Sequence, residues 1–240
     1  PFTLDARDGL ELHGYITFPP GVDRVGLPAV LNVHGGPWAR DAWGFRPEAQ
    51  WLANRGYACI QVNFRGSTGY GKDYYEAIDY GGLEVDDVVA TRDWALETLG
   101  YADPERVGIL GWSHGGLIAL MNLFRHPGAF QCAFAGVPVS DLVARMGYKG
   151  QGYRDLYEAD FHIGQTVEEN LAEYKRRSPV WNAHKLRTPL LIHTNTNDRD
   201  VHVLEVEHLI KSLQAANKEF RFKIYEDAPG GHSFNRLDTL

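Results

Sequence analysis

The stretch Val107–Leu120, which reads VGILGWSHGGLIAL, decides the fold of this sequence. A short apolar run leads into a Gly-Trp-Ser-His-Gly turn, and an apolar helical pattern follows at once. Such a turn leaves no room for side chains two residues before and after the serine, and Gly111 and Gly115 meet that requirement. The pattern predicts a nucleophile elbow, with Ser113 at the tip of a strand and the backbone N–H of His114 directed at a developing oxyanion. The alternative is a glycine-rich turn whose serine has no catalytic role.

A nucleophilic serine needs a histidine base, and the histidine needs a carboxylate that fixes its tautomer. His232 lies in a turn near the end of the sequence, directly after a strand-like run from 220 to 225. Gly230 and Gly231 give this turn the freedom to place the ring. We therefore predict His232 as the base; the alternative is a histidine in a surface loop.

The acid is expected just after a buried strand that lies between the serine and the histidine. Residues 189–193 form that apolar run, and a stretch rich in turn-forming residues follows it. Asp198 and Asp200 both lie in this stretch, and neither spacing nor chemistry separates them. The alternative role for either aspartate is to cap the helix expected to begin near Val203.

A second group of oxyanion donors is expected after an early strand. The apolar run 28–33 ends in His34-Gly35-Gly36-Pro37. Because a bare glycine backbone can approach a substrate carbonyl closely, we predict the N–H groups of Gly35 and Gly36 as donors, with the His34 side chain as a contributor. The alternative is a plain Gly-Gly-Pro turn.

Apolar runs typical of buried strands alternate with helical patterns along the chain. The expected strands are 12–18, 29–33, 57–63, 107–110, 132–137, 190–193 and 220–225, and the expected helices include 84–99 and 203–216. This alternation predicts an α/β fold with a mostly parallel central sheet and helices on both faces. A chain of 240 residues that is 44% hydrophobic can bury one sizeable core, so one domain is expected.

With these motifs in place, the sequence resembles the catalytic domain of the prolyl oligopeptidase family of serine peptidases. The resemblance runs from about residue 8 to 234 and includes the further segments 63–71, 84–88 and 189–193. It implies the α/β-hydrolase fold and hydrolysis of short peptides through an acyl-enzyme. It also implies Asp198 as the acid, because the family's acid usually stands three residues before a valine, here Val201.

The sequence departs from the family pattern at the acid turn. Many members have an Arg or Asn that contacts a substrate carbonyl where this chain has Asp200, and Arg199 stands one place early. A carboxylesterase of the same fold would share the elbow and the three catalytic residue types, so it remains an alternative function. A non-catalytic binding domain on a hydrolase scaffold is a second alternative.

The family usually carries a β-propeller ahead of the hydrolase domain. We therefore expect residues 1–240 to be a single catalytic domain excised from a longer chain, with an N-terminal propeller as its intramolecular partner. A face evolved to be covered by the propeller would be exposed in this fragment and would favour homo-oligomers.

Residues 140–179 interrupt the alternation of strands and helices and are expected to form an insertion over the active site. The segment is rich in aromatic residues, which would suit a pocket for the residue before the scissile bond. The predicted pocket residues are Tyr148, Tyr153, Tyr157 and Phe161, together with Trp112 and Arg199. The alternative for the aromatic residues is that they pack the insertion onto the body of the domain.

Composition and charge exclude several other functions. A net charge of −7 and a pI near 5.8 argue against nucleic acid or an anionic membrane as a partner. No apolar run approaches the roughly 20 residues of a membrane span. No charged-then-apolar signal segment opens the sequence; a cytoplasmic location is favoured, and a periplasmic or secreted location stays an alternative because the N-terminus of the full protein is expected to be missing. Cys59 and Cys132 are expected as buried thiols, and the scattered histidines and cysteines predict neither a metal nor another cofactor.

Overall fold

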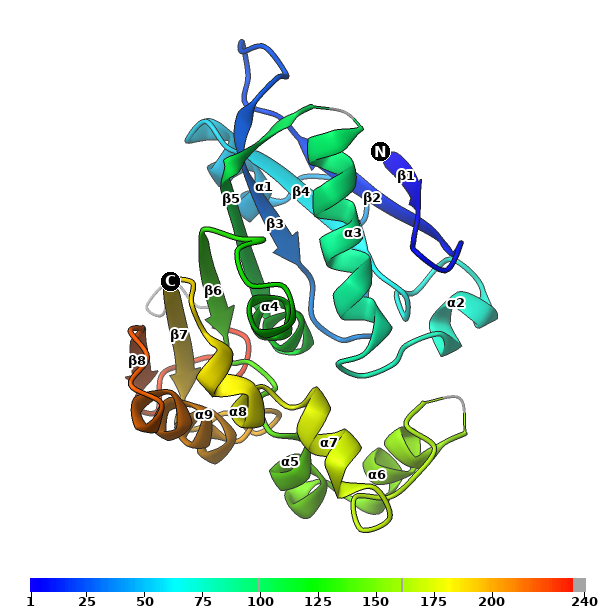
Figure 1. Cartoon of the computed structure of the whole chain (residues 1–240), viewed down its shortest axis with the longest axis vertical. Coiled ribbons are helices and arrows are strands. Elements are labelled where there is room, and N and C mark those ends of the chain that lie inside the picture. Colours follow the sequence, from blue (N-terminus) through cyan, green and yellow to red (C-terminus); the bar gives the residue numbers. More distant parts are fainter. Residues whose placement is uncertain (99, 161, 235–240) are drawn as a thin grey trace.

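The computed structural model describes residues 1–98, 100–160 and 162–234, and in these residues eight strands form one sheet (Figure 1). The strands are β1 (Phe2–Asp5), β2 (Glu11–Thr17), β3 (Leu27–Val33), β4 (Ala58–Asn63), β5 (Ala102–Trp112), β6 (Cys132–Gly136), β7 (Leu190–Asn195) and β8 (Arg221–Tyr225). Their order is β1-β2-β4-β3-β5-β6-β7-β8. The β1/β2 and β2/β4 pairs are antiparallel and all other pairs are parallel, so the predicted mostly parallel sheet is confirmed.

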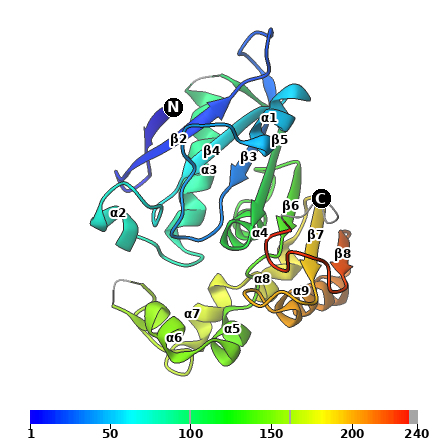
Figure 2. The same ribbon diagram turned by 180° about the vertical axis from the view of Figure 1, so that it is seen from behind.

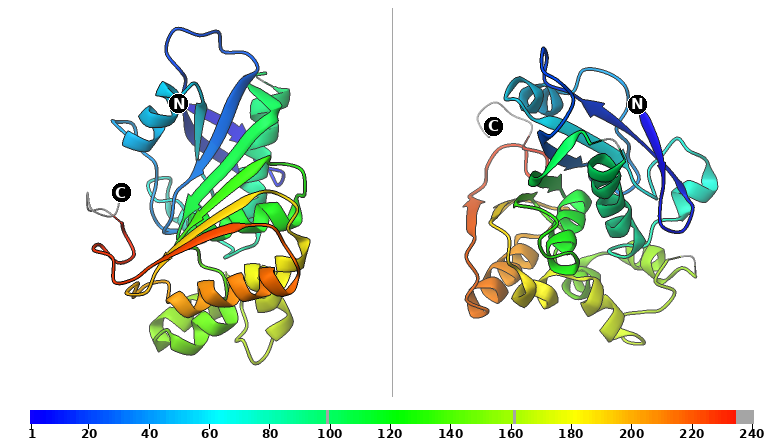
Figure 3. Two further views of the ribbon diagram at one scale, coloured as in Figure 1. Left: turned by 90° about the vertical axis from the view of Figure 1, so that its left-hand side faces the viewer. Right: turned by 45° about the horizontal axis from the view of Figure 1, so that its top comes forward.

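Helices cover the two faces of the sheet unequally. The helices are α1 (Pro47–Asn54), α2 (Lys72–Glu76), α3 (Leu83–Glu97), α4 (His114–Arg125), α5 (Leu142–Tyr148), α6 (Gln151–Glu158), α7 (Leu171–Arg177), α8 (Pro179–Asn182) and α9 (Val203–Ala215), with a 3₁₀ turn at Ala183–Lys185. Helices α3, α4 and α9 pack on one face, and α1 packs on the opposite face (Figure 3). Almost every residue of α4 is buried, which makes this helix the centre of the core.

In the part of the chain that the structure describes, the opposite face is well covered only beside α1. There Ala49, Leu52 and Cys59 form a small apolar cluster under the helix. Figure 2 shows β6, β7 and β8 on this face without a helix over them. The side chains of Cys132 and Leu191 are exposed there. The expectation that Cys132 is a buried thiol is therefore wrong, because the residue belongs to a strand but faces its uncovered side; Cys59 is buried as expected.

Some strands begin or end at other residues than the sequence pattern predicts. At these places hydrogen bonding between strand backbones, and not the type of side chain, sets the boundary. Strand β1 shows no distinct pattern in the sequence and forms because its backbone pairs with β2. Strand β5 begins at Ala102, five residues before the apolar run, and Ala102 pairs with Leu27 of β3. The predicted helix 84–99 is α3, which ends at Glu97; Leu99 lies outside the described residues.

Segment 140–179 contains α5, α6 and α7, which lie on the side toward which the parallel strands run (Figure 1). Two buried acidic residues attach the start of this segment to the body. Asp141 caps α5 by accepting hydrogen bonds from the N–H groups of Val143 and Ala144, at 3.1 and 3.2 Å, and its Oδ2 lies 2.8 Å from Nδ1 of His208 in α9. Glu205 of α9 accepts hydrogen bonds from the N–H groups of Ser140 and Asp141, at 3.1 and 3.2 Å. The segment is therefore fixed to α9 where it begins.

Candidate active site

Ser113 occupies a strained position between β5 and α4. Its φ of +57° lies in the left-handed region, which a residue other than glycine adopts at a cost. The backbone around it is packed so closely that a Cβ on Gly111 would lie 2.1 Å from the Gly115 carbonyl oxygen. A Cβ on Gly115 would lie 2.2 Å from the Val33 carbonyl oxygen. The two glycines therefore allow the turn, as the sequence predicted.

The backbone of two segments lies against the serine. His114 is the first residue of α4, a position whose N–H has no acceptor within the helix. Gly35 lies directly against the elbow, since a Cβ on it would be 3.3 Å from Cβ of Ser113 and 2.8 Å from the Trp112 carbonyl oxygen. The helix α4 also presents the positive end of its dipole to the serine.

The His34 ring is held by neighbours on both of its nitrogens. Nδ1 lies 2.7 Å from the Gly35 carbonyl oxygen, and Nε2 lies 2.9 Å from Oγ of Ser67. The ring also stacks on Phe64, with centroids 4.4 Å apart. Burial lowers the pKa of His34 to about 4, so the ring is neutral at neutral pH. The ring nitrogens are thus occupied, and the backbone of this loop is better placed than the His34 side chain to receive a substrate.

The His114 side chain is buried and forms a pair that the sequence analysis missed. Its Nε2 lies 3.2 Å from Oε1 of Glu84, at the start of α3. Burial alone would raise the pKa of Glu84, but the hydrogen bond with His114 and the N–H group of Gly81 outweigh burial and lower it. The pair joins the start of α3 to the elbow. Because 30 residues separate its partners, only the fold brings them together.

Asp198 and His232 meet at the ends of β7 and β8. Nδ1 of His232 lies 2.7 Å from Oδ2 of Asp198, whose side chain is fully buried. Oδ1 of Asp198 accepts hydrogen bonds from the N–H groups of Asp200 and Val201, at 2.8 and 3.0 Å. The carboxylate is therefore fixed by its own turn and directed at the ring. The prediction that an aspartate of this turn caps the next helix is wrong, because His202 caps α9.

Asn195 connects the turn after β7 to the turn that carries His232. Its Nδ2 donates hydrogen bonds to the carbonyl oxygens of Ala228 and Gly231, at 2.9 and 3.2 Å. Its Oδ1 accepts a hydrogen bond from the N–H of Ala228, at 3.1 Å. Asn195 is completely buried. No sequence pattern indicates this role, since an asparagine in a turn-rich stretch gives no signal of a partner 33 residues away.

Asp200 lies on the other side of the His232 ring. Its Oδ2 is 3.6 Å from Nε2 of His232. Its Oδ1 accepts a hydrogen bond from Nζ of Lys149, at 2.7 Å, and lies 3.4 Å from Arg145. Burial by itself would raise the pKa of Asp200, but the hydrogen bond from Lys149 and the charge of Arg145 lower it, so the carboxylate is ionised at neutral pH.

Arg145 makes polar contacts between segment 140–179 and the turn after β7 that carries Asp198 and Asp200. The guanidinium is almost fully buried and forms a salt bridge with Glu205, at 3.0 Å. It also donates hydrogen bonds to the hydroxyls of Tyr148 and Tyr153, at 2.9 and 2.7 Å. No sequence pattern distinguishes Arg145, because a single arginine in a helical stretch is usually a solvated residue.

The predicted pocket residues do not all lie together. Tyr157 is buried, with its ring 3.9 Å from that of Tyr80, so it packs the insertion onto the body of the domain. Tyr148 and Tyr153 surround Arg145 instead of forming an open aromatic wall. Trp112 packs against Phe134 and Phe234, and Arg199 is exposed. Phe161 lies outside the described residues.

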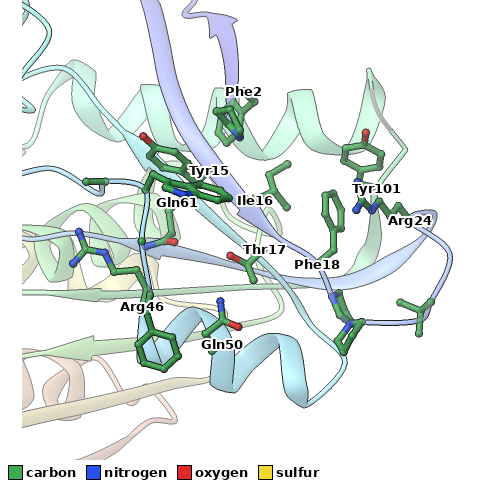
Figure 4. A pocket seen from close by; sticks show the side chains of 18 of the residues that line it. Phe2, Tyr15, Ile16, Thr17, Phe18, Arg24, Arg46, Gln50, Gln61 and Tyr101 are labelled. Carbon is green, nitrogen blue, oxygen red and sulfur yellow. The ribbon is translucent and has the colours of Figure 1, made fainter.

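Two hollows adjoin each other, and one of them includes the loop at Gly35. One, of about 680 Å³, is lined by Gly35, Trp112, His232 and neighbouring residues. The other, of about 1070 Å³, lies against β2 and the start of α1, where Tyr15, Thr17, Phe18 and Gln50 surround it (Figure 4). Arg46 and Gln61 line both, so the hollows adjoin. The larger hollow is therefore not itself at Ser113.

Within the described ranges, no group of three or more His, Cys, Asp or Glu side chains is arranged to hold a metal ion. The helices of these ranges also include none with the length and apolar character that crossing a membrane requires.

The class of the protein follows from the topology and from the place of the strained serine. A mostly parallel eight-stranded sheet with a serine at a strand-to-helix elbow, followed along the chain by an aspartate and a histidine, is the arrangement of the α/β-hydrolase fold. The chain has this fold.

The comparisons with known proteins identify the family. A model of the prolyl oligopeptidase family, peptidase family S9, matches residues 43–238, and the chain belongs to this family of serine peptidases. The chain is 35% identical over its whole length to dipeptidyl aminopeptidase BIII of Pseudoxanthomonas mexicana, of which it covers 36%. It also matches the structure of a puromycin hydrolase, with a TM-score of 0.88 and 29% identity over 99% of this chain and 36% of that one. The acylaminoacyl peptidase of Pyrococcus horikoshii matches with a TM-score of 0.87 and 26% identity, over 99% of this chain and 38% of that one.

The chain thus spans little more than a third of the length of these relatives. Its fold and its family agree with the resemblance seen in the sequence.

Proposed function

We propose that this chain is the catalytic domain of a peptidase that hydrolyses short peptides through Ser113, His232 and Asp198. The pairing of His232 with Asp198, at 2.7 Å, carries the proposal. A buried carboxylate on Nδ1 fixes the tautomer that leaves Nε2 free to accept the proton of the serine hydroxyl. Asp198 is already held by two backbone N–H groups, so it does not need to rearrange for this role.

In this mechanism Oγ of Ser113 attacks the peptide carbonyl while His232 accepts the hydroxyl proton. The oxyanion of the tetrahedral intermediate binds the N–H groups of His114 and of Gly35 or Gly36. His232 then protonates the leaving amine, and an acyl-enzyme forms. Water activated by His232 hydrolyses the acyl-enzyme and releases the acid product. The close contact of Gly35 with the elbow supports its part in this scheme.

A propeller domain ahead of this chain and an active-site cover formed by residues 140–179 belong to the same proposal. The first is supported by the small share of each relative that the chain spans. The second is supported by the contacts of Arg145 and Lys149, both from this segment, with the acid turn.

Replacement of Ser113 by alanine tests the proposed mechanism. We expect kcat/KM for peptide 4-nitroanilides to fall by several orders of magnitude, with a much smaller change in substrate affinity. A fluorophosphonate probe should label the unmodified protein and fail to label the Ser113→Ala variant. Cleavage of anilides, which are amides, separates a peptidase from a carboxylesterase. Full turnover by the Ser113→Ala variant would exclude the mechanism.

A further inference from the structure

Asp200 places an ionised oxygen atom beside the reacting centre. Its Oδ2 lies 3.6 Å from Nε2 of His232, the atom that handles the proton in the proposed function. One residue of an extended peptide spans about 3.3–3.6 Å. This separation from Nε2 is about the span of one residue, so in the proposed function the oxygen faces the residue whose carbonyl is attacked; its side chain is 51% exposed, so a substrate can reach it.

The neighbours of Asp200 leave this oxygen as a hydrogen-bond acceptor. Lys149 and Arg145 both contact Oδ1, at 2.7 and 3.4 Å. Arg145 is itself balanced by Glu205, and His232 is balanced by Asp198. Lys149 and Arg145 thus fix the orientation of the Asp200 side chain and keep it ionised, while both contact Oδ1 and leave Oδ2 open to a substrate.

A carboxylate can only accept hydrogen bonds, so it selects the substrate group that faces it. A carbonyl oxygen would meet like charge and lose its hydration without a new partner. An ammonium group would form a charge-assisted hydrogen bond. The local chemistry therefore disfavours a substrate that presents a carbonyl here and favours one that presents a positively charged donor.

We propose that Oδ2 of Asp200 binds the free α-ammonium of the residue whose carbonyl Ser113 attacks. The inference rests on the proposed function and makes it more specific. The preferred substrates are amides of a single amino acid with a free amino group. N-acylated amino acids and dipeptides, in which an amide carbonyl takes the place of that ammonium group, are poorer substrates.

The test compares three 4-nitroanilides that share one residue before the scissile bond: the free amino acid, its N-acetyl derivative and a dipeptide that ends in it. Leucine, phenylalanine, alanine and proline are used in turn at that residue. We expect the free amino acid to have the highest kcat/KM, by about 10- to 100-fold, through a lower KM. Its advantage should shrink above about pH 8, where the α-amino group loses its proton.

The Asp200→Asn variant should reduce the advantage of the free amino acid over its N-acetyl derivative by at least tenfold. Asp73→Asn is the matched control, because Asp73 is an exposed aspartate in α2, and it should keep the ratio of the unmodified protein. Equal or faster cleavage of the N-acetyl or dipeptide substrates would overturn the inference while the proposed function stands. The same holds if Asp200→Asn slows all three substrates equally. Absence of turnover of every substrate together with absence of fluorophosphonate labelling would overturn both.

Discussion

Asp198 and Asp200 stand two residues apart in one turn, and their surroundings give them different roles. The Asp198 side chain is fully buried, while that of Asp200 is 51% exposed and contacts two cations. We predict that Asp198→Asn lowers kcat by about 10⁴, because an amide would favour the wrong tautomer of His232. Asp200→Asn should act mainly through KM for substrates with a free amino group. Steady-state kinetics with both variants tests this ranking, and the reverse ranking would make Asp200 the acid.

Asp41 gives a prediction for the pH dependence of stability. Its Oδ1 accepts a hydrogen bond from Gln61 at 2.8 Å, whereas its Oδ2 has no hydrogen-bond partner among the described residues. Burial raises the pKa of Asp41 from its ordinary value of 3.8 to about 6. Below about pH 4 this carboxyl is protonated in the folded and unfolded states, so it imposes no pH-dependent penalty. Between about pH 4 and 6 the unfolded state ionises first, and the free energy of unfolding falls.

The Asp41→Asn variant should lack this loss, since an amide does not titrate. The measurement is urea unfolding of both proteins at intervals from pH 4 to 7. We expect the unmodified protein to lose stability relative to the variant over this range, by about 1.4 kcal/mol for each unit of pKa difference that is realised. Parallel pH profiles would show that Asp41 has an ordinary pKa in the folded protein.

At the scale of elements, the position of His232, the proposed base, depends on the connection between two turns. Asn195, at the end of β7, holds the backbone of Ala228 and Gly231 after β8. Asn195→Ala would leave the buried N–H of Ala228 without its acceptor, at a cost of about 1–3 kcal/mol. It would also loosen the turn that places His232. We therefore predict a lower kcat together with reduced stability.

Asn197→Ala is the matched control for this prediction. Asn197 is exposed and makes a single longer hydrogen bond to the Ala228 carbonyl oxygen, at 3.3 Å. The control should therefore change kcat and the free energy of unfolding only slightly. The test measures kcat and the free energy of unfolding in urea for both variants. If the two variants behave alike, the connection through Asn195 does not position the histidine.

At the scale of the whole molecule, the two faces of the sheet differ in their exposure to solvent. Cys59 lies under α1, and burial raises the pKa of its thiol to about 12. Cys132 lies on the uncovered part of the same face and is exposed. We predict that a thiol reagent modifies Cys132 in the native protein and Cys59 only after unfolding. Mass spectrometry of the labelled protein before and after denaturation identifies the modified residue, and native labelling of Cys59 would contradict the packing of α1.

Local chemistry accounts for the features that the sequence alone determined. Strands β3, β4, β6 and β7 and the second half of β5 are short runs rich in apolar residues, and α4 is apolar almost throughout, so periodicity and composition predict them. The elbow was also readable, because its glycines are required within two residues of Ser113. The family followed from several such local motifs together, and the match over residues 43–238 confirms it.

Only the tertiary structure shows which residues of distant segments contact each other. Asp198 and Asp200 are the same residue type in one turn, and only packing against the insertion and the His232 turn buries one and exposes the other. Arg145, Asn195 and the Glu84–His114 pair bind partners 30 or more residues away, which no local pattern encodes. The exposure of Cys132 likewise depends on which face of the sheet a helix covers. The sequence by itself therefore determined the helices and strands and the residue types of the candidate site. The tertiary structure decided which side chains are buried and which residues they contact, because burial and hydrogen bonding across the fold depend on segments that meet only after folding.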